Sequence, residues 1–205
     1  MDATPIDYSL VSKALEFYVS KGYEYIDVPW MINPKFGKMT ESPDSGIFTT
    51  IDSYGRELHL IGSGELGFIQ MAHLMIPNKK YVSATPCFRR GDISVIHSET
   101  FFKVELSSCS NSSNEMYLEF INDAMILFKQ FGADSNRLNI TYPDKNDYRF
   151  NHDIEYPVSL YGQRPFMLEL GSYGQRYIEN LHSTNNVINY GTGLALPRFQ
   201  LIEKT

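Results

Sequence analysis

The apolar residues of the N-terminal segment recur with the period of an α-helix. They are Leu10, Val11, Ala14, Leu15 and Tyr18. Thr4, followed by Pro5 and then by Asp7 at the third helical position, is typical of a helix start, and Gly22 is typical of a helix end. The pattern predicts an amphipathic first helix between Thr4 and Gly22.

Two later stretches also predict helices. Residues 64–76, GELGFIQMAHLMI, follow Ser63, which can cap a helix N-terminus. Residues 116–134, MYLEFINDAMILFKQFGAD, follow Ser112 and Glu115, whose spacing is that of a capping box. We therefore expect a second helix capped by Ser63 and a long third helix introduced by Ser112 and Glu115.

Runs rich in β-branched and aromatic residues predict strands in the rest of the chain. They cover residues 23–30, 56–63, 80–89, 100–106, 137–143, 152–160, 165–174 and 186–191. The runs at 80–89 and 100–106 predict an antiparallel hairpin with an irregular tip, and residues 192–205 a glycine-flanked loop that turns into a short terminal helix. Helices at the ends and in the middle, with consecutive strands between them, indicate an α+β fold whose largely antiparallel sheet is flanked by helices.

Composition limits the kinds of protein this can be. A chain of 205 residues suits a single domain over residues 1–205. No apolar run approaches the ~18 residues that span a bilayer, and the N-terminus lacks the features of a secretory signal, so we expect no membrane partner and a cytoplasmic protein. Cys87 and Cys109 are too few for a disulfide scaffold and are interpreted as buried thiols.

The charge of the chain argues against a long nucleic-acid footprint. The formal net charge is −6, and no dense run of lysine and arginine offsets it. A small phosphate-bearing ligand needs only a few well-placed arginines. The chain can therefore bind a nucleotide without binding an extended polynucleotide.

Two features of the predicted hairpin could contact such a ligand. Arg89 and Arg90 follow an apolar strand, and a guanidinium there needs either an acid of the protein or a visiting anion; an internal salt bridge is the commoner arrangement. Phe101 and Phe102 alternate along a strand, so one belongs to the core. The other lies on the arginine-bearing hairpin, where its ring could stack on a planar base.

Three further positions have both a functional and a structural interpretation. Glu169 and Ser172 lie at the end of an apolar strand and carry the oxygen ligands that suit Mg²⁺, although in isolation a strand acid bonded to a neighbour is the stronger interpretation. Glu65 at a helix start is explained by the helix dipole unless a cationic ligand binds there. The GTG run at residues 191–193 allows close approach of a ligand or simply a turn.

In this order, the segments resemble the catalytic core of class II aminoacyl-tRNA synthetases, in particular the seryl branch. GYEYIDVPW is similar to motif 1, in which the equivalent of Pro29 lies at the homodimer interface. TPCFRRGD with FFKVEL is similar to motif 2, which implies that Arg89 binds the α-phosphate of ATP and Phe101 stacks on adenine. YGTGLALPRF is similar to motif 3, which implies a second ATP-binding and catalytic arginine at Arg198.

The resemblance also implies an amino-acid pocket and a metal site. GSGEL, with Glu65, is similar to the loop that binds the substrate ammonium, and Glu105 falls at an acid that faces the amino acid. Tyr190, Gly191 and Thr192 belong to the same implied pocket. ELGS, after DIEYP, is similar to the strand whose acid and serine bind Mg²⁺ and ATP, here Glu169 and Ser172.

The implied activity is ATP-dependent amino acid activation, the formation of an aminoacyl adenylate by a homodimer. Two arginines and Mg²⁺ would stabilise the charge that develops on the phosphates, and no general base is needed because the amino acid carboxylate is already ionised. The implied acceptor is a carrier protein, a small molecule or a minimal tRNA acceptor end. The sequence has no basic patch that could bind a larger tRNA.

Several departures from the family pattern keep other interpretations open. Gly91 stands where motif 2 has glutamate, with Asp92 one step later, and Tyr190 stands where the seryl pocket has asparagine. The terminal helix after Arg198 is short. A non-catalytic synthetase paralogue, acting as a dimeric regulatory or scaffold subunit, is the alternative, and a catalytic piece of a larger complex is a third possibility.

Overall fold

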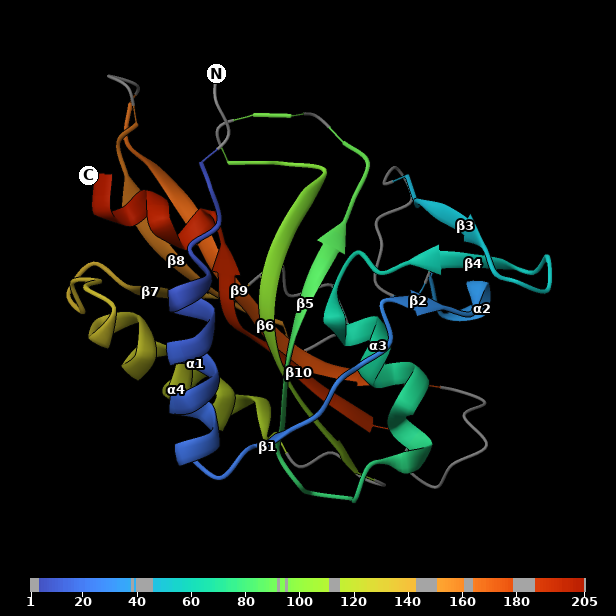
Figure 1. Cartoon of the computed structure of the whole chain (residues 1–205). Helices are drawn as coiled ribbons and strands as arrows, with labels where there is room; N and C mark the ends of the chain where they lie inside the picture. The colour runs from blue at the N-terminus through green and yellow to red at the C-terminus, as the bar shows by residue number, and fades with distance from the viewer. Residues whose placement is uncertain are drawn as a thin grey trace.

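The chain forms two β-sheets in a computed structural model that describes residues 4–37, 39, 46–91, 93–94, 96–110, 115–142, 151–160, 164–178 and 187–204. The large sheet has seven strands in the order β1-β5-β6-β10-β9-β8-β7 and the small one three in the order β2-β4-β3 (Figure 1). The strands of the large sheet are β1 Glu24–Tyr25, β5 Tyr81–Phe88, β6 Thr100–Ser110, β7 Asn139–Thr141, β8 His152–Val158, β9 Phe166–Tyr177 and β10 Val187–Leu196. Those of the small sheet are β2 Met31–Ile32, β3 Thr49–Ile51 and β4 Glu57–Leu60.

Helices cover both faces of the large sheet. They are α1 Tyr8–Ser20, α2 Pro34–Gly37, α3 Gly64–Met71 and α4 Tyr117–Gln130, with 3-10 turns η1 Ala72–Leu74 and η2 Arg198–Lys204. In Figure 1, α1 and α4 lie to one side of the sheet, and α3 lies to the other side with the small sheet. Among the residues that the structure describes, β1 and β5 pair in parallel and the other strand pairs are antiparallel. The predicted α+β fold with a largely antiparallel sheet is confirmed.

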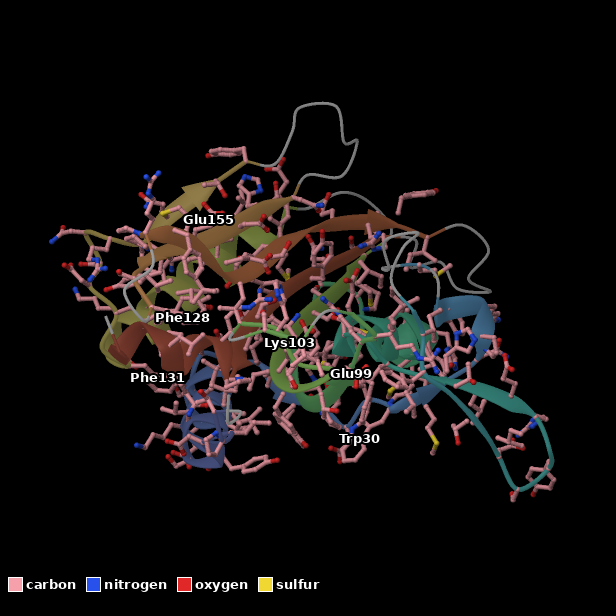
Figure 2. The ribbon with its side chains drawn as sticks, turned by 90° about the horizontal axis from the view of Figure 1, so that it is seen from above. Trp30, Glu99, Lys103, Phe128, Phe131 and Glu155 are labelled. Atoms are coloured by element: carbon pink, nitrogen blue, oxygen red, sulfur yellow. The ribbon has the colours of Figure 1, made fainter. Side chains whose placement is uncertain are left out.

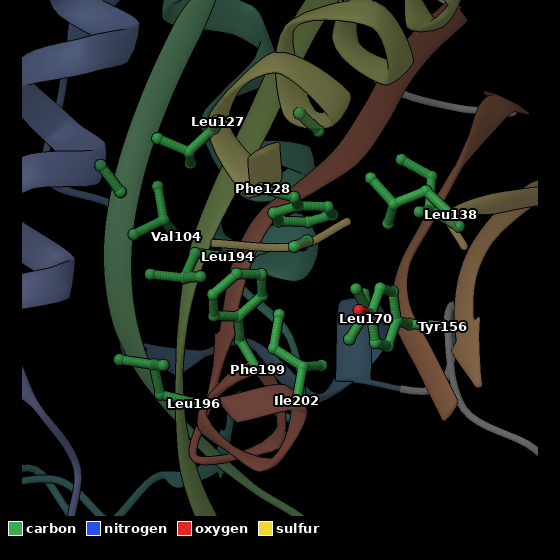
Figure 3. Close-up of a cluster of buried hydrophobic side chains, with 14 of the residues drawn as sticks. Val104, Leu127, Phe128, Leu138, Tyr156, Leu170, Leu194, Leu196, Phe199 and Ile202 are labelled. Carbon is green, nitrogen blue, oxygen red and sulfur yellow. The ribbon is translucent and has the colours of Figure 1, made fainter. Parts of the chain in front are cut away.

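The main hydrophobic core lies between the large sheet and helices α1 and α4. Strand β6 gives Val104 and Leu106 to this core, and β10 gives Leu194 and Leu196. Figure 3 shows the part of it that also contains Phe128 of α4 and residues of η2. A second buried cluster lies under α3 and includes Phe68. Because side chains alternate along a strand, the residues of β6 between these core positions face the other way, towards the site described below.

The structure corrects two predicted helix starts. The first helix begins at Tyr8, because Asp7 is its N-cap and accepts a hydrogen bond from the Ser9 amide at 2.8 Å; Thr4 is not the cap. The third helix begins at Tyr117, and Glu115 has a φ of +48°, which excludes it from the helical first turn that a capping box requires. Ser112 lies outside the described residues.

The segment 192–196 is strand, not the glycine-flanked loop predicted for it. It completes β10, which pairs with β6 along its length. Glycine is required here for packing: a Cβ on Gly193 would lie 2.7 Å from Cε2 of Tyr18 in α1. The short terminal helix is confirmed as η2. In the part of the chain that the structure describes, no helix is long and apolar enough to cross a membrane.

Candidate active site

The hairpin of β5 and β6 brings Arg89 against Phe101. Cys87 pairs with Phe101 across the hairpin, and Arg89 follows the end of β5. Nε of Arg89 donates to the Gly62 carbonyl at 2.7 Å, and its guanidinium carbon lies 5.3 Å from the centre of the Phe101 ring. Neither contact cancels the positive charge of Arg89, so the guanidinium is oriented by neutral groups and remains suited to an anion.

Arg198 lies at the same end of the sheet. Leu196, the last residue of β10, pairs with Phe102, so Arg198 follows β10 where β6 begins. Strand β6 separates the ends of β5 and β10, and a strand spacing of ~4.8 Å puts these two ends about 10 Å apart. Nη1 of Arg198 donates to the Glu169 carbonyl at 3.1 Å and to Glu169 Oε1 at 3.2 Å.

The neighbouring strands β8 and β9 carry oxygen ligands beside Arg198. Glu169 pairs with Glu155, and Ser172 pairs with Asp153. Burial raises the pKa of Asp153 to about 6, although a hydrogen bond with Ser172 opposes this shift, and the nearby charges of Glu169 and Glu155 raise the pKa further. The predicted residues Glu169 and Ser172 therefore lie in a cluster of oxygen donors that also contains Asp153.

The donor chemistry of this cluster fits Mg²⁺. Carboxylate and hydroxyl oxygens are the ligands that this ion accepts, and it takes the rest of its shell from water and substrate phosphates. Over the described ranges, no group of three His, Cys, Asp or Glu side chains is arranged to hold a metal ion unaided. Glu169 and Ser172 can thus serve a metal that arrives with a nucleotide. Sequence reasoning did not identify Asp153. It is two residues from Glu155 in the strand sequence DIE, and this spacing puts both acids on the same face of the strand.

The two acids expected at the amino-acid pocket are buried and paired. Glu105 is 2% exposed; its Oε1 accepts a hydrogen bond from Ser63 Oγ at 2.6 Å and lies 2.7 Å from Lys103 Nζ. A Cβ on Gly64 would lie 2.9 Å from Cγ of Glu105, so the start of α3 packs directly on β6. Figure 2 shows Lys103 near the middle of the molecule.

Glu65 forms an ion pair with Arg176, a residue that sequence reasoning did not identify. Nε of Arg176 lies 2.8 Å from Glu65 Oε1, and the two side chains are 14% and 8% exposed. Burial raises the pKa of Glu65, the positive charge of Arg176 and its hydrogen bond oppose that shift, and Glu105 adds to it. The only sequence signal for Arg176 is its even spacing from Ser172 on β9, which puts both on one face.

The three pocket residues from β10 have different surroundings. The ring of Tyr190 lies 5.4 Å from the guanidinium carbon of Arg176, and the Tyr190 hydroxyl donates to Asn151. Oγ1 of Thr192 accepts a hydrogen bond from the Ser172 amide at 3.4 Å. A Cβ on Gly191 would lie 2.7 Å from Cδ1 of Tyr173, so packing explains this glycine. Tyr190 and Thr192 contact predicted or neighbouring site residues, whereas Gly191 has a structural requirement of its own.

Two remaining positions lie away from the pocket. Pro29 lies between β1, at the edge of the large sheet, and β2. The next two residues, Trp30 and Met31, are each 53% exposed, and Figure 2 shows Trp30 near the edge of the molecule. Gly91 is exposed, with no atom near its missing Cβ, and Asp92 lies outside the described residues.

Comparisons with known proteins agree with this fold. The cytoplasmic serine-tRNA ligase from Naegleria fowleri in complex with AMP matches with a TM-score of 0.71 at 19% identity, over 95% of this chain and 47% of that chain. The seryl-tRNA synthetase from Pyrococcus horikoshii complexed with ATP matches with a TM-score of 0.73 at 20% identity, over 96% of this chain and 49% of that chain. The chain therefore has the fold of the class II synthetase catalytic core.

A sequence comparison points to the same branch. The chain is 27% identical over 176 residues to the serine-tRNA ligase of Mesoplasma florum, a match that covers 69% of this chain and 40% of the ligase. No family model matches the chain. The resemblance to the catalytic core of the serine branch is confirmed. The chain spans less than half the length of each of these relatives.

Proposed function

We propose that this protein activates an amino acid with ATP to form an aminoacyl adenylate. The observation that carries the proposal is the orientation of Arg89, held by the Gly62 carbonyl against Phe101, at the end of the sheet where Arg198 begins η2. An aromatic face and two guanidinium groups suit a base and its phosphates. The similarity to synthetases solved with AMP and ATP supports the same ligand class.

The residues have separate roles in the proposed reaction. The carboxylate oxygen of the amino acid attacks the α-phosphorus of ATP, the bond to the bridging oxygen breaks, and pyrophosphate leaves. Arg89 binds the α-phosphate and Arg198 the departing phosphates, so positive charge is in place before the transition state forms. Phe101 stacks on adenine. Glu169 and Ser172 would hold Mg²⁺, which would supply further positive charge to the phosphate oxygens.

The amino acid is positioned by the acids at the start of α3 and on β6. Glu65 and Glu105 bind the substrate ammonium, next to Tyr190 and Thr192, and this fixes the carboxylate in line with the α-phosphorus. The acceptor of the activated group is a carrier protein, a small molecule or a tRNA acceptor end. A net charge of −6 disfavours an extended polyanionic partner.

Pyrophosphate exchange tests the activation step. Each of the twenty standard amino acids is assayed with ATP and Mg²⁺, and at least one should support exchange. Arg89→Ala should reduce that exchange by about 100-fold or more, because it removes preorganised positive charge. Arg90→Ala is the matched control: this neighbour is exposed and lies over Phe48, so its loss should leave exchange within about threefold. Absence of exchange with every amino acid in folded protein would contradict the proposal.

The second candidate is a non-catalytic paralogue that keeps the fold as a dimeric scaffold. Two observations favour it: Gly91 replaces the glutamate of motif 2, and Glu169 Oε1 is already paired with Arg198. Binding of ATP with Mg²⁺ separates the two candidates, since a scaffold has no need of the nucleotide.

A homodimer through the segment around Pro29 is part of both candidates. Exposed Trp30 and Met31 beside Pro29 provide apolar area for such a contact. Sedimentation equilibrium should give twice the mass of the chain, and Trp30→Asp should shift the protein towards monomer. Leu74→Asp, a change at an apolar side chain of 66% exposure outside that segment, should leave the dimer intact.

A further inference from the structure

The floor of the proposed amino-acid pocket carries two ion pairs. Glu65 is paired with Arg176 at 2.8 Å, and Glu105 with Lys103 at 2.7 Å. All four side chains are at most 14% exposed. Two acids and two cations cancel one another, so the pocket is not the negative site that a substrate with only an ammonium group would select.

The pair between Glu65 and Arg176 is expected to persist when substrate binds. Breaking a buried ion pair leaves an uncompensated charge and is strongly unfavourable. A carboxylate has two oxygens that accept several hydrogen bonds, so Glu65 can hold Nε of Arg176 and a substrate ammonium together. The ammonium therefore adds to the pair without displacing the guanidinium.

Arg176 is placed to meet the side chain of the substrate. It is four residues along β9 from Ser172, on the same face, and Gly174 between them adds no side chain to that face. Its guanidinium is fixed by Glu65 on one side and by the ring of Tyr190 on another, and Tyr190 is opposite Gly174 in register. A planar guanidinium held in this way binds carboxylate or phosphate oxygens in pairs.

We propose that Arg176 determines specificity, and that the pocket selects an amino acid with an anionic side chain, a carboxylate or a phosphate. This inference rests on the proposed function for the identity of the pocket. With such a substrate, Glu65 binds the ammonium, Arg176 binds the side-chain anion, and the α-carboxylate is directed towards Arg89. A neutral side chain would have no charge to offer to the desolvated guanidinium.

Calorimetric titration with isosteric amino acids tests the proposal. The full chain is titrated with L-aspartate, L-glutamate and O-phospho-L-serine, and with the neutral matches L-asparagine, L-glutamine and L-serine, with and without ATP and Mg²⁺. At least one anionic amino acid should bind more tightly than its neutral match by about 10-fold or more, since a hydrogen bond between charged groups contributes a ratio of this order. The three anionic probes distinguish a carboxylate from a phosphate ligand.

Variants at Arg176 show whether this residue causes the preference. Arg176→Gln should reduce the ratio to within about threefold, and Arg176→Lys, which keeps the charge but loses the planar donors, should give an intermediate ratio. Arg176→Lys also keeps a cationic partner for the buried Glu65, so it keeps the preference testable if Arg176→Gln unfolds the protein. Arg90→Gln, an exposed arginine on the hairpin, should keep the wild-type ratio.

These measurements distinguish a failure of the specificity inference from a failure of the proposed activation chemistry. Equal binding of the isosteres, a preference for the neutral forms, or a preference that survives Arg176→Gln would overturn the inference. If a neutral amino acid supports pyrophosphate exchange independently of Arg176, the activation chemistry stands and the inference fails. If anionic amino acids bind through Arg176 but no exchange occurs, the pocket assignment stands and the activation chemistry fails.

Discussion

The space available to a side chain in this fold depends on whether its residue faces the core. Gly191 and Gly91 show the contrast. The missing Cβ of Gly191 points at Tyr173 and Phe120 in the core, whereas that of Gly91 points at open space. Both glycines lie in segments that resemble synthetase motifs. Packing against the core constrains Gly191 but not Gly91.

Gly191→Ala is expected to destabilise the protein by about 1–3 kcal/mol, because its Cβ would lie 2.7 Å from the Tyr173 ring and core overpacking has a cost of this size. Urea denaturation followed by circular dichroism measures the change. Gly91→Ala is the matched control and should stay within about 0.5 kcal/mol of wild type. Equal effects of the two changes would show that Gly191 does not pack as described.

Asp153 should make stability depend on pH in a magnesium-free buffer. Its pKa is raised to about 6 by burial, from a value of 3.8. Between these two values the folded state holds a proton that the unfolded state has lost, so the free energy of unfolding falls as pH rises from about 4 to about 6. Asp153→Asn removes this dependence.

The gain of Asp153→Asn over wild type should therefore grow across that interval, by about 1 kcal/mol once solvent screening of this partly exposed group is allowed for. Urea denaturation at pH 4, 5, 6 and 7 gives the difference. A constant difference across the series would mean that the Asp153 carboxyl titrates normally in the folded state.

Helices and strands follow the sequence pattern where the pattern is local. Two β-rich runs predict the hairpin of β5 and β6, which the structure contains. Gly22 predicts the end of α1, and its φ of +84° shows why glycine stands there. The start of α1 was misplaced because Thr4 and Asp7 are both good caps. The strand residues 192–196 were misread as a loop because Gly193 is needed for its contact with Tyr18 of α1, which no local pattern reveals.

The same reasoning explains which parts of the site were found. Arg89 and Phe101 lie on one hairpin and could be linked from sequence. The pair between Glu65 and Arg176 joins residues 111 positions apart and required the sheet order to be known. Asp153 meets Ser172 only through the pairing of β8 with β9. Candidate site residues could be named from the motifs, and their roles stay predictions, whereas the partners that neutralise them could not be named from sequence.

A buried hydrogen bond joins α1 to β10, and its contribution to stability can be measured by mutation. Tyr18 is fully buried, and its hydroxyl donates to the Gly193 carbonyl at 3.0 Å. Tyr18→Phe should destabilise the protein by about 1 kcal/mol, because it leaves a buried carbonyl without that donor. Tyr8→Phe in the same helix, at a side chain of 62% exposure, should change stability by less than about 0.5 kcal/mol. Thermal or urea unfolding of both variants decides, and equal effects would argue against the bond.

At the scale of the whole molecule, the hydrophobic core and the proposed ligand-binding residues lie on opposite faces of the main sheet. Helices α1 and α4 bury the large core on one face. The other face carries Arg89, Phe101, Lys103 and Glu105, and α3 and the small sheet lie on that side (Figure 1). The seven-stranded sheet thus brings residues that are distant in sequence close together, and this arrangement lets a chain with less than half the length of its relatives present the proposed nucleotide-binding residues on one face.

Calorimetric titration of the purified chain with ATP and Mg²⁺ tests the account most directly. Wild type and Arg90→Ala should bind with the same affinity. Arg89→Ala and Arg198→Ala should each weaken binding by about 10-fold or more, as expected for loss of a charged phosphate contact. Binding that is absent in folded wild-type protein, or that is unchanged in both Arg89→Ala and Arg198→Ala, would contradict the claim that these two guanidinium groups form a nucleotide site.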